Sequence, residues 1–414
     1  MNITMITIGS TGDVQPYVLL GKELKKRGHR ITIATFGKFA DLIENSGLSF
    51  FSLSGDAEKM MNTVMEADSI GMKYLPRLEK SLRSVAPALL QDIYDSCCTA
   101  DAMICNFFGS VYYSVAEDRR IPCVQTQYFP MDPTGDFPVS SFPFQHLGHR
   151  MNLASYHVAY LLIGMFEKRY LSEWRKSNDL AERKVRNAPD YRIGDHTVPV
   201  IYAISPKVIP RPQDWGPHIH MSGYWFDPEP VEWIPPEDLV CFLENKPTPV
   251  YIGFGSMTSG NMTKLYVAVL KTIRALKIRA VINLGWTDKK MHSTKNLYFT
   301  NYIPHDWIFP RVQAVIHHGG AGTTAAGLKH GKPTLVIPFG GDQAFWGDRI
   351  YQLKCGPRPV SRHHLKLSQL IKAIVKLLNN PEYRANAEAL SRELAAEEGL
   401  MTAADLVEEE IKNW

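Results

Sequence analysis

The sequence has little cysteine, and none of it is spaced for metal binding. Six cysteines occur among 414 residues, without a C-x-x-C arrangement. We interpret the vicinal pair Cys97-Cys98 as two reduced thiols and not as a ligand pair. This usage argues against a cysteine-based metal site and favours a reducing compartment.

Targeting signals and a strong charge of one sign are also missing. Residues 1–6 contain no cationic segment and no long apolar run, so they do not resemble a signal peptide. The longest apolar run of interest, Val158 to Phe166, is far shorter than a membrane span. A net charge of +4 is too weak to indicate nucleic-acid binding. We therefore expect a cytoplasmic protein.

What is present is an ordinary globular composition, with 45% apolar and 21% charged residues. A chain of 414 residues is too long for one hydrophobic core, so two domains are expected.

The most specific local pattern lies at residues 314–331. An apolar, β-branched run ends at His317, and a turn rich in glycine leads into a predicted helix: Gly319, Gly320, Gly322 and Thr323. A helix N-terminus lined by glycine presents free backbone N–H groups and a partial positive charge, which suit a phosphate. His317 can donate a further hydrogen bond to a phosphate oxygen. A tight turn without a ligand is the alternative.

The chain opens with a predicted strand, loop, helix and second strand, and the loop is Gly9–Asp13. This order gives a parallel sheet with the loop at its carboxyl edge, where ligands bind. The glycines do not follow G-x-G-x-x-G, which counts against dinucleotide binding. Asp13 can act there as a general base or cap the following helix, and the local sequence alone favours the cap.

The middle of the chain is predicted to contain a long loop at residues 128–144, with four prolines and several aromatic side chains. Loops of this length in a compact domain are often functional. A strongly apolar helix is expected at 149–174, followed by a basic stretch. The plain interpretation is a core helix with a solvated basic face. The alternative is an apolar acceptor cleft beside a membrane-surface patch.

Three further elements are expected from composition. Helices are predicted at residues 72–90 and 381–410, and the proline-rich stretch 205–236 is predicted to be a linker.

Five motifs together resemble those of the GT-B glycosyltransferases. They are G-S-T-G-D-V-Q-P at residues 9–16, F-G-S-M at 254–257, P-H-D-W-I-F-P at 304–310, H-H-G-G-A-G-T-T at 317–324 and G-G-D-Q-x-F-W-G at 340–347. Within this group the chain most resembles the sterol 3-β-glucosyltransferases and the glycopeptide-aglycone transferases. The likeness covers nearly the whole chain, including S-P-K-V-I-P-R-P-Q-D-W-G at 205–216.

The resemblance implies an α/β protein of the GT-B fold, with two Rossmann-like domains that face a central cleft. We expect an acceptor-binding domain at residues 1–205, a linker at 206–246 and a nucleotide-sugar-binding domain at 247–395. A C-terminal helix at 396–414 is expected to cross back onto the first domain.

The resemblance also implies an inverting transfer from a nucleotide sugar, usually UDP-glucose, to a hydroxyl group. In this family the aspartate at the position of Asp13 is the proposed base, which shifts our interpretation from cap to base. Relatives with a histidine there orient it with a second aspartate, whereas the matching strand here ends in Asn106. The chain lacks the D-x-D that binds metal in GT-A enzymes, so we expect neither metal nor cofactor.

Site residues follow from the motifs by analogy. The donor phosphates are expected to bind at the glycine turn with His317 and Ser256. The sugar hydroxyls are expected to bind Asp342 and Gln343, and the nucleotide base is expected to contact Tyr302 and Ile303. The donor set is therefore Ser256, Tyr302, Ile303, His317, Gly319, Gly320, Gly322, Thr323, Asp342 and Gln343. The expected acceptor-binding residues are Ser10, Phe129, Phe137 and Phe142.

The acceptor is expected to be a lipophilic alcohol such as a sterol, because the acceptor half offers many apolar side chains and few placed polar ones. Polyketide or glycopeptide aglycones with a UDP- or TDP-sugar remain open, as does a nucleotide-sugar epimerase. A non-catalytic accessory protein is disfavoured by the presence of Asp13. Nucleic acid is not expected as a partner, and peripheral contact with a membrane stays open.

Overall fold

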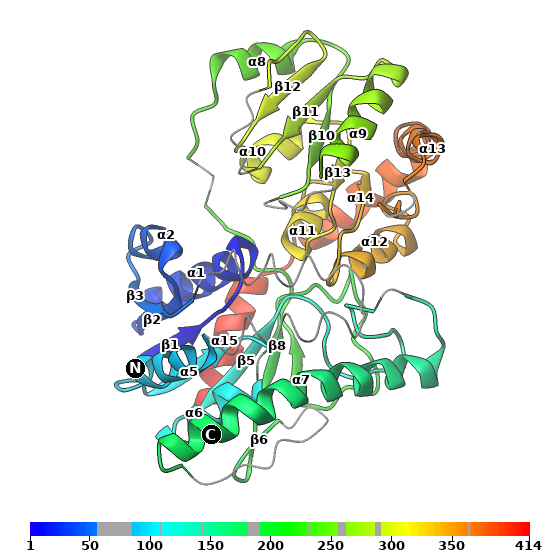
Figure 1. Ribbon diagram of the computed structural model, residues 1–414. Helices are drawn as coiled ribbons and strands as arrows, with labels where there is room; N and C mark the ends of the chain where they lie inside the picture. Colours follow the sequence, from blue (N-terminus) through cyan, green and yellow to red (C-terminus); the bar gives the residue numbers. More distant parts are fainter. Residues whose placement is uncertain are drawn as a thin grey trace. The chain divides into compact units, whose positions relative to one another are not determined.

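The computed structural model divides the chain into two compact units, each built on a parallel sheet (Figure 1). Unit 1 comprises residues 1–139, 146–226 and 398–414, and unit 2 comprises 140–145 and 227–397. The structure describes residues 1–55, 85–107, 109–142, 144–180, 191–229, 232–255, 262–285, 291–362 and 365–414.

Unit 1 contains a seven-stranded parallel sheet in the order β3-β2-β1-β4-β5-β8-β9. Its strands are β1 (Asn2–Ile6), β2 (Arg30–Phe36), β3 (Ser49–Leu53), β4 (Ala102–Cys105), β5 (Cys123–Gln127), β8 (Val200–Tyr202) and β9 (Ile219–Met221). A small antiparallel pair is formed by β6 (Arg192–Ile193) and β7 (His196–Thr197). The central strands β1 and β4 are almost continuously buried, as expected for parallel strands covered on both faces.

The helices of unit 1 are α1 (Thr11–Lys26), α2 (Ala40–Glu44), α5 (Ala86–Ser96), α6 (Gly109–Arg119), α7 (His149–Ser177) and α15 (Gly399–Lys412). Helix α1 follows β1 directly, so its N-terminus lies at the carboxyl edge of the sheet, where the predicted base is located.

Unit 2 contains a five-stranded parallel sheet in the order β12-β11-β10-β13-β14. The strands are β10 (Val250–Gly253), β11 (Ala280–Asn283), β12 (Leu297–Thr300), β13 (Val315–His317) and β14 (Thr334–Val336). Its helices are α8 (Glu237–Glu244), α9 (Met262–Leu276), α10 (His305–Ile308), α11 (Ala321–Lys329), α12 (Gln343–Gln352), α13 (Leu367–Asn379) and α14 (Pro381–Leu394).

Two expectations about element boundaries need correction. The predicted linker is folded over much of its length, because residues up to Phe226 belong to unit 1 and β9 pairs with β8. The single helix expected over 381–410 is two helices, α14 and α15. A side chain at Gly399 would meet the Tyr224 carbonyl oxygen at 2.4 Å, so α15 begins where two backbones approach closely. The helix predicted at 72–90 lies mostly outside the described residues, and α5 continues to Ser96.

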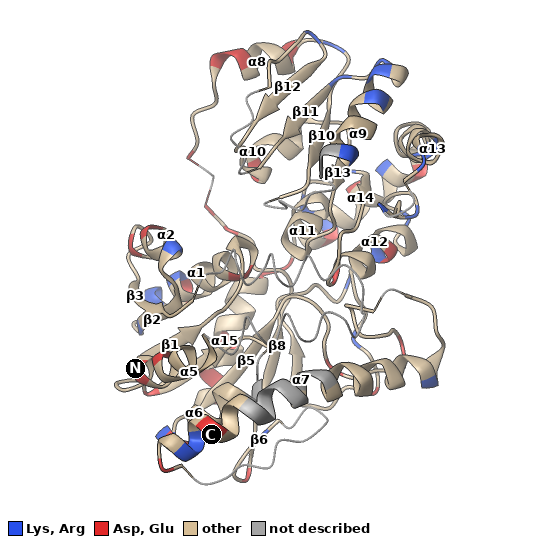
Figure 2. Cartoon of the chain, viewed as in Figure 1, with Lys and Arg blue, Asp and Glu red and all other residues tan. Residues whose placement is uncertain are grey.

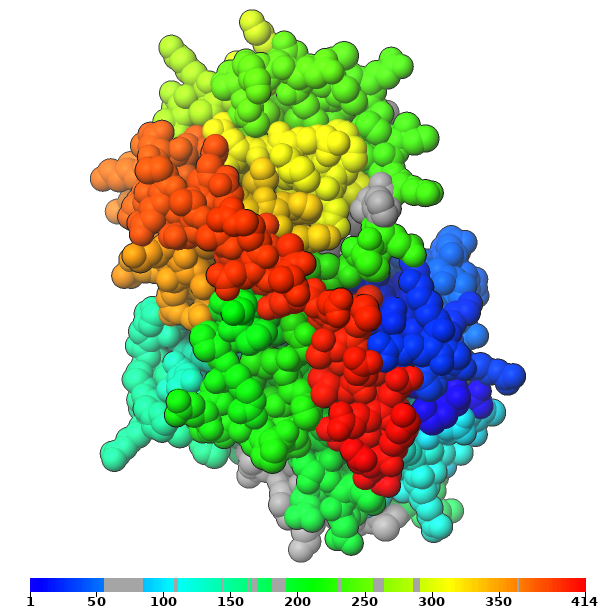
Figure 3. Space-filling view, turned by 180° about the vertical axis from the view of Figure 1, so that it is seen from behind, coloured from blue at the N-terminus to red at the C-terminus, as the bar shows by residue number. Residues whose placement is uncertain are grey.

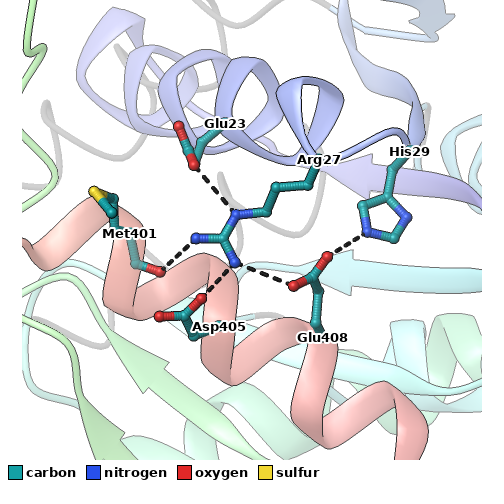
Figure 4. A network of polar contacts seen from close by, with 6 residues as sticks. All are labelled: Glu23, Arg27, His29, Met401, Asp405 and Glu408. Carbon is teal, nitrogen blue, oxygen red and sulfur yellow. Dashed lines mark hydrogen bonds and ion pairs between the residues drawn. The ribbon is translucent and has the colours of Figure 1, made fainter.

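Helix α15 packs against α1 within unit 1, and from behind the red C-terminal segment is seen beside the blue N-terminal one (Figure 3). The buried face of α15 is apolar: Ala403, Ala404, Val407 and Ile411. Arg27 at the end of α1 bonds the carboxylates of Asp405 and Glu408, and His29 bonds Glu408 at 2.8 Å (Figure 4). Such surface ion pairs add little energy, so burial of the apolar face contributes most to the packing of α15 on unit 1.

Acidic and basic residues occur on both units (Figure 2). None of the helices in the described part of the chain combines the length and apolar character needed to cross a bilayer.

Candidate functional site

The candidate catalytic group of unit 1 is the carboxylate of Asp13, in the first turn of α1. Ser10 is the N-cap residue of this helix. The Ser10 backbone N–H donates to Asp13 Oδ2 at 2.6 Å, and the Ser10 hydroxyl donates to the same oxygen at 2.9 Å. Asp13 therefore does not cap the helix as the N-cap residue, but completes a capping box from the third position.

The loop before α1 is shaped to admit this carboxylate. A Cβ at Gly9 would lie 2.3 Å from Asp13 Oδ2, so glycine is required for the side chain to fold back. Both described hydrogen bonds of the carboxylate use Oδ2, which leaves Oδ1 to receive a proton. The two hydrogen bonds from Ser10 give the Asp13 side chain the fixed orientation that a general base needs.

Burial raises the pKa of Asp13 above its ordinary value, and the two hydrogen bonds from Ser10 partly offset this effect. A raised pKa makes the carboxylate a stronger base once it has ionised.

Two neighbours support the loop and not the carboxylate. Buried Asn106 donates to the Ile8 carbonyl at 3.2 Å and accepts from the Tyr112 hydroxyl at 2.9 Å. The Tyr128 hydroxyl donates to the Asp13 carbonyl oxygen at 3.2 Å. Tyr128 was missed as a contact of the base, although its place at the start of the aromatic loop was a signal.

The predicted phosphate-binding turn of unit 2 has the expected strand–turn–helix form. Strand β13 ends at His317, Gly320 is the N-cap residue of α11, and the helix starts at Ala321. Gly319 has φ +98°, and a Cβ there would lie 2.6 Å from Val336 Cγ1. Only glycine fits this position, so the turn directs the N–H groups of the first helical turn, including those of Gly322 and Thr323, out of the helix end.

His317 is the decisive residue of this turn. It is buried, and its Nδ1 accepts the Gly319 N–H at 2.9 Å. Burial, reinforced by His318 and His305, lowers the pKa of His317 well below its usual value, so the ring is neutral. Because Nδ1 is an acceptor, the hydrogen must be on Nε2. This Nε2–H is buried and has no hydrogen-bond partner among the described residues.

A buried donor left without an acceptor costs roughly 1–3 kcal/mol. A buried Nε2–H without a partner in the described ranges, on the last residue before a turn into a helix, is therefore suited to donate to an oxygen atom of a ligand. An anionic oxygen at this place would accept from Nε2 and from the free backbone N–H groups of α11. The second histidine, His318, was not predicted as a site residue, and its Nδ1 is also buried without a described partner.

The other predicted donor residues have varied environments. Asp342 is the N-cap residue of α12 and its Oδ2 accepts the Trp346 indole N–H at 2.7 Å. Buried Gln343 accepts the Phe339 N–H at 2.7 Å, so its carbonyl oxygen shapes the loop. Tyr302 is 65% exposed, whereas the Ile303 side chain lies in a buried cluster. Ser256 lies outside the described residues.

The predicted acceptor residues are not equivalent. Ser10 orients Asp13 directly. The Phe129 ring packs against Phe107 at 5.4 Å, and the Phe137 ring meets Trp215 edge-on at 6.5 Å. Phe142 belongs to unit 2, although it was expected in the acceptor-binding domain at residues 1–205. It is half-buried, and its ring centroid lies 6.2 Å from that of Phe144, which is 64% exposed.

The first half of α7 does not behave as a plain core helix. Asn152, Ser155 and Tyr156 are buried, whereas Met151 and Val158 are more than half exposed. Apolar side chains therefore face outward at this end, which keeps the alternative of an apolar binding surface open.

No group of three or more histidine, cysteine, aspartate or glutamate side chains in the described ranges is arranged to hold a metal ion.

Two family models match the chain. The glycosyltransferase family 28 N-terminal domain matches residues 3–136, and the erythromycin biosynthesis protein CIII-like C-terminal domain matches residues 269–408.

Sterol 3-beta-glucosyltransferases from fungi and plants are similar over nearly the whole chain. The protein of Candida albicans is 33% identical over 99% of this chain and 28% of its own length. UGT80A2 and UGT80B1 of Arabidopsis thaliana are 34% and 32% identical over 97% and 98% of this chain. The chain spans 64% and 67% of those two proteins, so it matches only part of these relatives.

Solved structures share the fold at low identity. A glycotransferase of kitacinnamycin has a TM-score of 0.74 at 18% identity, covering 99% of both chains. Glycosyltransferase VinC, solved in complex with dTDP, has a TM-score of 0.69 at 16% identity, covering 100% of both chains.

Proposed function

Because the chain belongs to the family of the sterol 3-beta-glucosyltransferases and has the GT-B fold, we propose that it transfers a hexose from a nucleotide sugar to a hydroxyl group. The specific reaction proposed is inverting, metal-independent transfer of glucose from UDP-glucose to a lipophilic alcohol such as a sterol. The observation that carries this proposal is the buried Nε2–H of His317, which has no hydrogen-bond partner among the described residues and belongs to the last residue of the strand before α11.

The donor half of the reaction is assigned to unit 2. Departure of UDP leaves negative charge on the diphosphate, and donors already in place stabilise that charge best in a dry environment. His317 Nε2–H and the free N–H groups of α11 provide such donors. By analogy with the family motifs, Asp342 and Gln343 would bind sugar hydroxyls. Tyr302 and Ile303 would contact the nucleotide base, and Ser256 would contact a phosphate.

The acceptor half is assigned to unit 1 together with Phe142, which belongs to residues 140–145 of unit 2. The acceptor oxygen forms a bond to the anomeric carbon as the bond to the diphosphate oxygen breaks, and Asp13 takes the hydroxyl proton. Attack from the face opposite the leaving group inverts the anomeric centre, so an α-linked donor gives a β-glycoside. Ser10 supports this step because both of its donors hold the same carboxylate oxygen.

The names of the similar curated proteins favour a sterol as acceptor. The alternative is a natural-product aglycone, favoured by structural neighbours such as the calicheamicin glycosyltransferase CalG4. These neighbours share only 14–18% identity, so they support the fold and do not decide the acceptor. The sterol reading is therefore preferred.

The proposal is tested by incubating the protein with UDP-glucose and TDP-glucose, separately, against a panel of sterols, polyketide aglycones and glycopeptide aglycones. We expect glucosyl sterol from UDP-glucose. Transfer only to a non-sterol aglycone would show that the acceptor is not a sterol. Conversion of the nucleotide sugar into its epimer without an acceptor would support an epimerase.

Metal independence is expected, because protein N–H groups supply the charge that a metal would otherwise bring. Initial rates in excess EDTA should equal those without it within about twofold. Loss of transfer in EDTA that Mg²⁺ or Mn²⁺ restores would contradict this assignment of roles.

Phe142→Ala is expected to raise the acceptor KM roughly 10-fold, since burial of a large apolar side chain against a ligand contributes about 1.5–3 kcal/mol before ordering costs. The melting temperature and the UDP affinity should change little. Phe51→Ala, which removes a half-buried ring on β3, is the matched control. A large fall in melting temperature with unaltered acceptor kinetics would assign Phe142 to the core.

A further inference from the structure

The described residues of the loop at 128–144 form no helix or strand, yet many of them are buried. The buried positions include Pro130–Asp132, Thr134–Gly135 and Pro138–Ser140. A loop without internal ladders keeps a single shape only if other segments fix it. Those segments therefore determine where its aromatic side chains lie.

One fixed point is the buried carboxyl of Asp132. Tyr191 and Tyr202 each donate a hydroxyl hydrogen to one of its two oxygens. The hydroxyl oxygen of Tyr202 also accepts hydrogen bonds from the backbone N–H groups of Met131 and Asp132, at 3.0 and 3.1 Å. Burial raises the pKa of Asp132 to about 7, even though the hydrogen bond from Tyr202 acts in the opposite direction.

The second fixed point is the P-Q-D-W-G turn at residues 212–216, which the assignment of the catalytic and donor groups leaves without a role. The Arg211 guanidinium donates to four carbonyl oxygens around this turn, those of Pro212, Trp215, Gly216 and Ile219. This arrangement rigidifies the turn from within.

Asp214 and Trp215 extend from this turn to the loop. Asp214 Oδ1 accepts the buried Thr134 hydroxyl at 2.7 Å, and Oδ2 accepts the Gly135 N–H at 2.8 Å. The Trp215 ring stacks on Tyr202 at 4.8 Å, and its indole N–H donates to the Asp132 carbonyl at 3.3 Å. Trp215 therefore joins the two fixed points.

The loop also touches the candidate base. Tyr128, its first residue, donates to the Asp13 carbonyl and packs edge-on against Tyr17, one turn further along α1. The P-Q-D-W-G turn thus contacts residues 132–135 of the loop, and the first residue of the same loop, Tyr128, contacts the Asp13 backbone.

We propose that Asp214 and Trp215 are positioning residues that fix residues 131–137 and so preorganise the acceptor-binding loop. This inference rests on the proposed function for its kinetic readout. The loop carries Phe129 and Phe137, and the Phe137 ring itself contacts Trp215. When the contacts of Asp214 and Trp215 with the loop are lost, the loop must become ordered as the acceptor binds. This cost weakens binding of the acceptor and not binding of the donor.

The test is Asp214→Ala, assayed by transfer kinetics and by hydrogen exchange. We expect the acceptor KM to rise roughly 10-fold, as for lost hydrogen bonds to a charged group, with the donor KM within about twofold of wild type. Exchange should accelerate in peptides covering residues 131–137 and not in those of unit 2. Asp101→Ala is the control, because exposed Asp101 also accepts a distant backbone N–H, from Asn2 at 2.7 Å.

A second variant, Asp214→Asn, separates positioning from charge. The amide can still accept the Gly135 N–H and donate to Thr134, so we expect most of the acceptor affinity to return. Equal rises in donor and acceptor KM, or faster loop exchange without any change in acceptor KM, would overturn the proposal. If wild-type protein transfers no sugar in the acceptor panel, the proposed function fails. Hydrogen exchange of residues 131–137 in Asp214→Ala then still shows whether Asp214 holds the loop in place.

Discussion

Replacing Asp13 with asparagine is expected to lower kcat for sugar transfer by about 10²–10⁴-fold, the usual contribution of a general base. The amide is nearly isosteric and can still accept the Ser10 N–H, so the capping box and the stability of α1 should persist. UDP affinity should be unchanged, because the proposed donor groups are in unit 2. The measurement is steady-state kinetics together with UDP titration calorimetry.

The pH profile gives the same variant a second readout. Only ionised Asp13 accepts a proton, so wild-type kcat should fall as the pH decreases through the raised pKa of this group. In Asp13→Asn this acidic limb should disappear from the residual rate. Near-full activity of the variant with an unaltered profile would reduce Asp13 to a helix-capping residue.

Replacing His317 with asparagine is expected to lower kcat about 10²–10³-fold, the loss seen when one donor to a developing negative charge is removed. Asparagine can keep an acceptor near the place of Nδ1 for the Gly319 N–H, but it does not reach the position of Nε2. UDP affinity should fall together with kcat, since the product diphosphate uses the same donor. The check is transfer kinetics with UDP titration.

His317→Gln is the matched variant, because its longer amide can place an N–H near Nε2 while giving up the Nδ1 acceptor. We expect it to keep more activity than His317→Asn despite a lower melting temperature. The opposite order, with activity following stability, would mean that His317 only shapes the turn.

Local patterns in the sequence were enough to predict the strand–turn–helix units. The GT-B fold and the family are confirmed by the comparisons. The strand ending at His317 and the helix after Gly320 follow from β-branched and glycine residues that act over a few positions. The interaction of Ser10 with Asp13 is likewise local, three residues apart. The sequence left open whether Asp13 caps the helix or acts as a base. The geometry is compatible with both roles, because Oδ2 completes the capping box and Oδ1 remains to receive a proton.

Contacts between distant segments could not be predicted in this way. The bond from Thr134 to Asp214 spans 80 residues, and no periodicity reports it. Strand β9 was hidden in a proline-rich stretch because its three residues form an edge strand, whose pairing depends on β8. The break before α15 depends on the close approach of Gly399 to Tyr224, which composition does not reveal.

The tautomer of His317 is also a tertiary property. The sequence predicts a histidine near phosphate, but the hydrogen on Nε2 follows only from the Gly319 N–H on Nδ1 and from the burial that keeps the ring neutral.

The most direct test of the proposed reaction is the anomeric configuration of the product formed from UDP-α-glucose and a sterol. The coupling between the anomeric proton and its neighbour in the NMR spectrum of the purified product distinguishes the two configurations. Direct displacement assisted by Asp13 predicts a β-glucoside from wild-type protein and almost none from Asp13→Asn. An α-glucoside, or equal yields of β-glucoside from both proteins, would contradict a single displacement with Asp13 as the base.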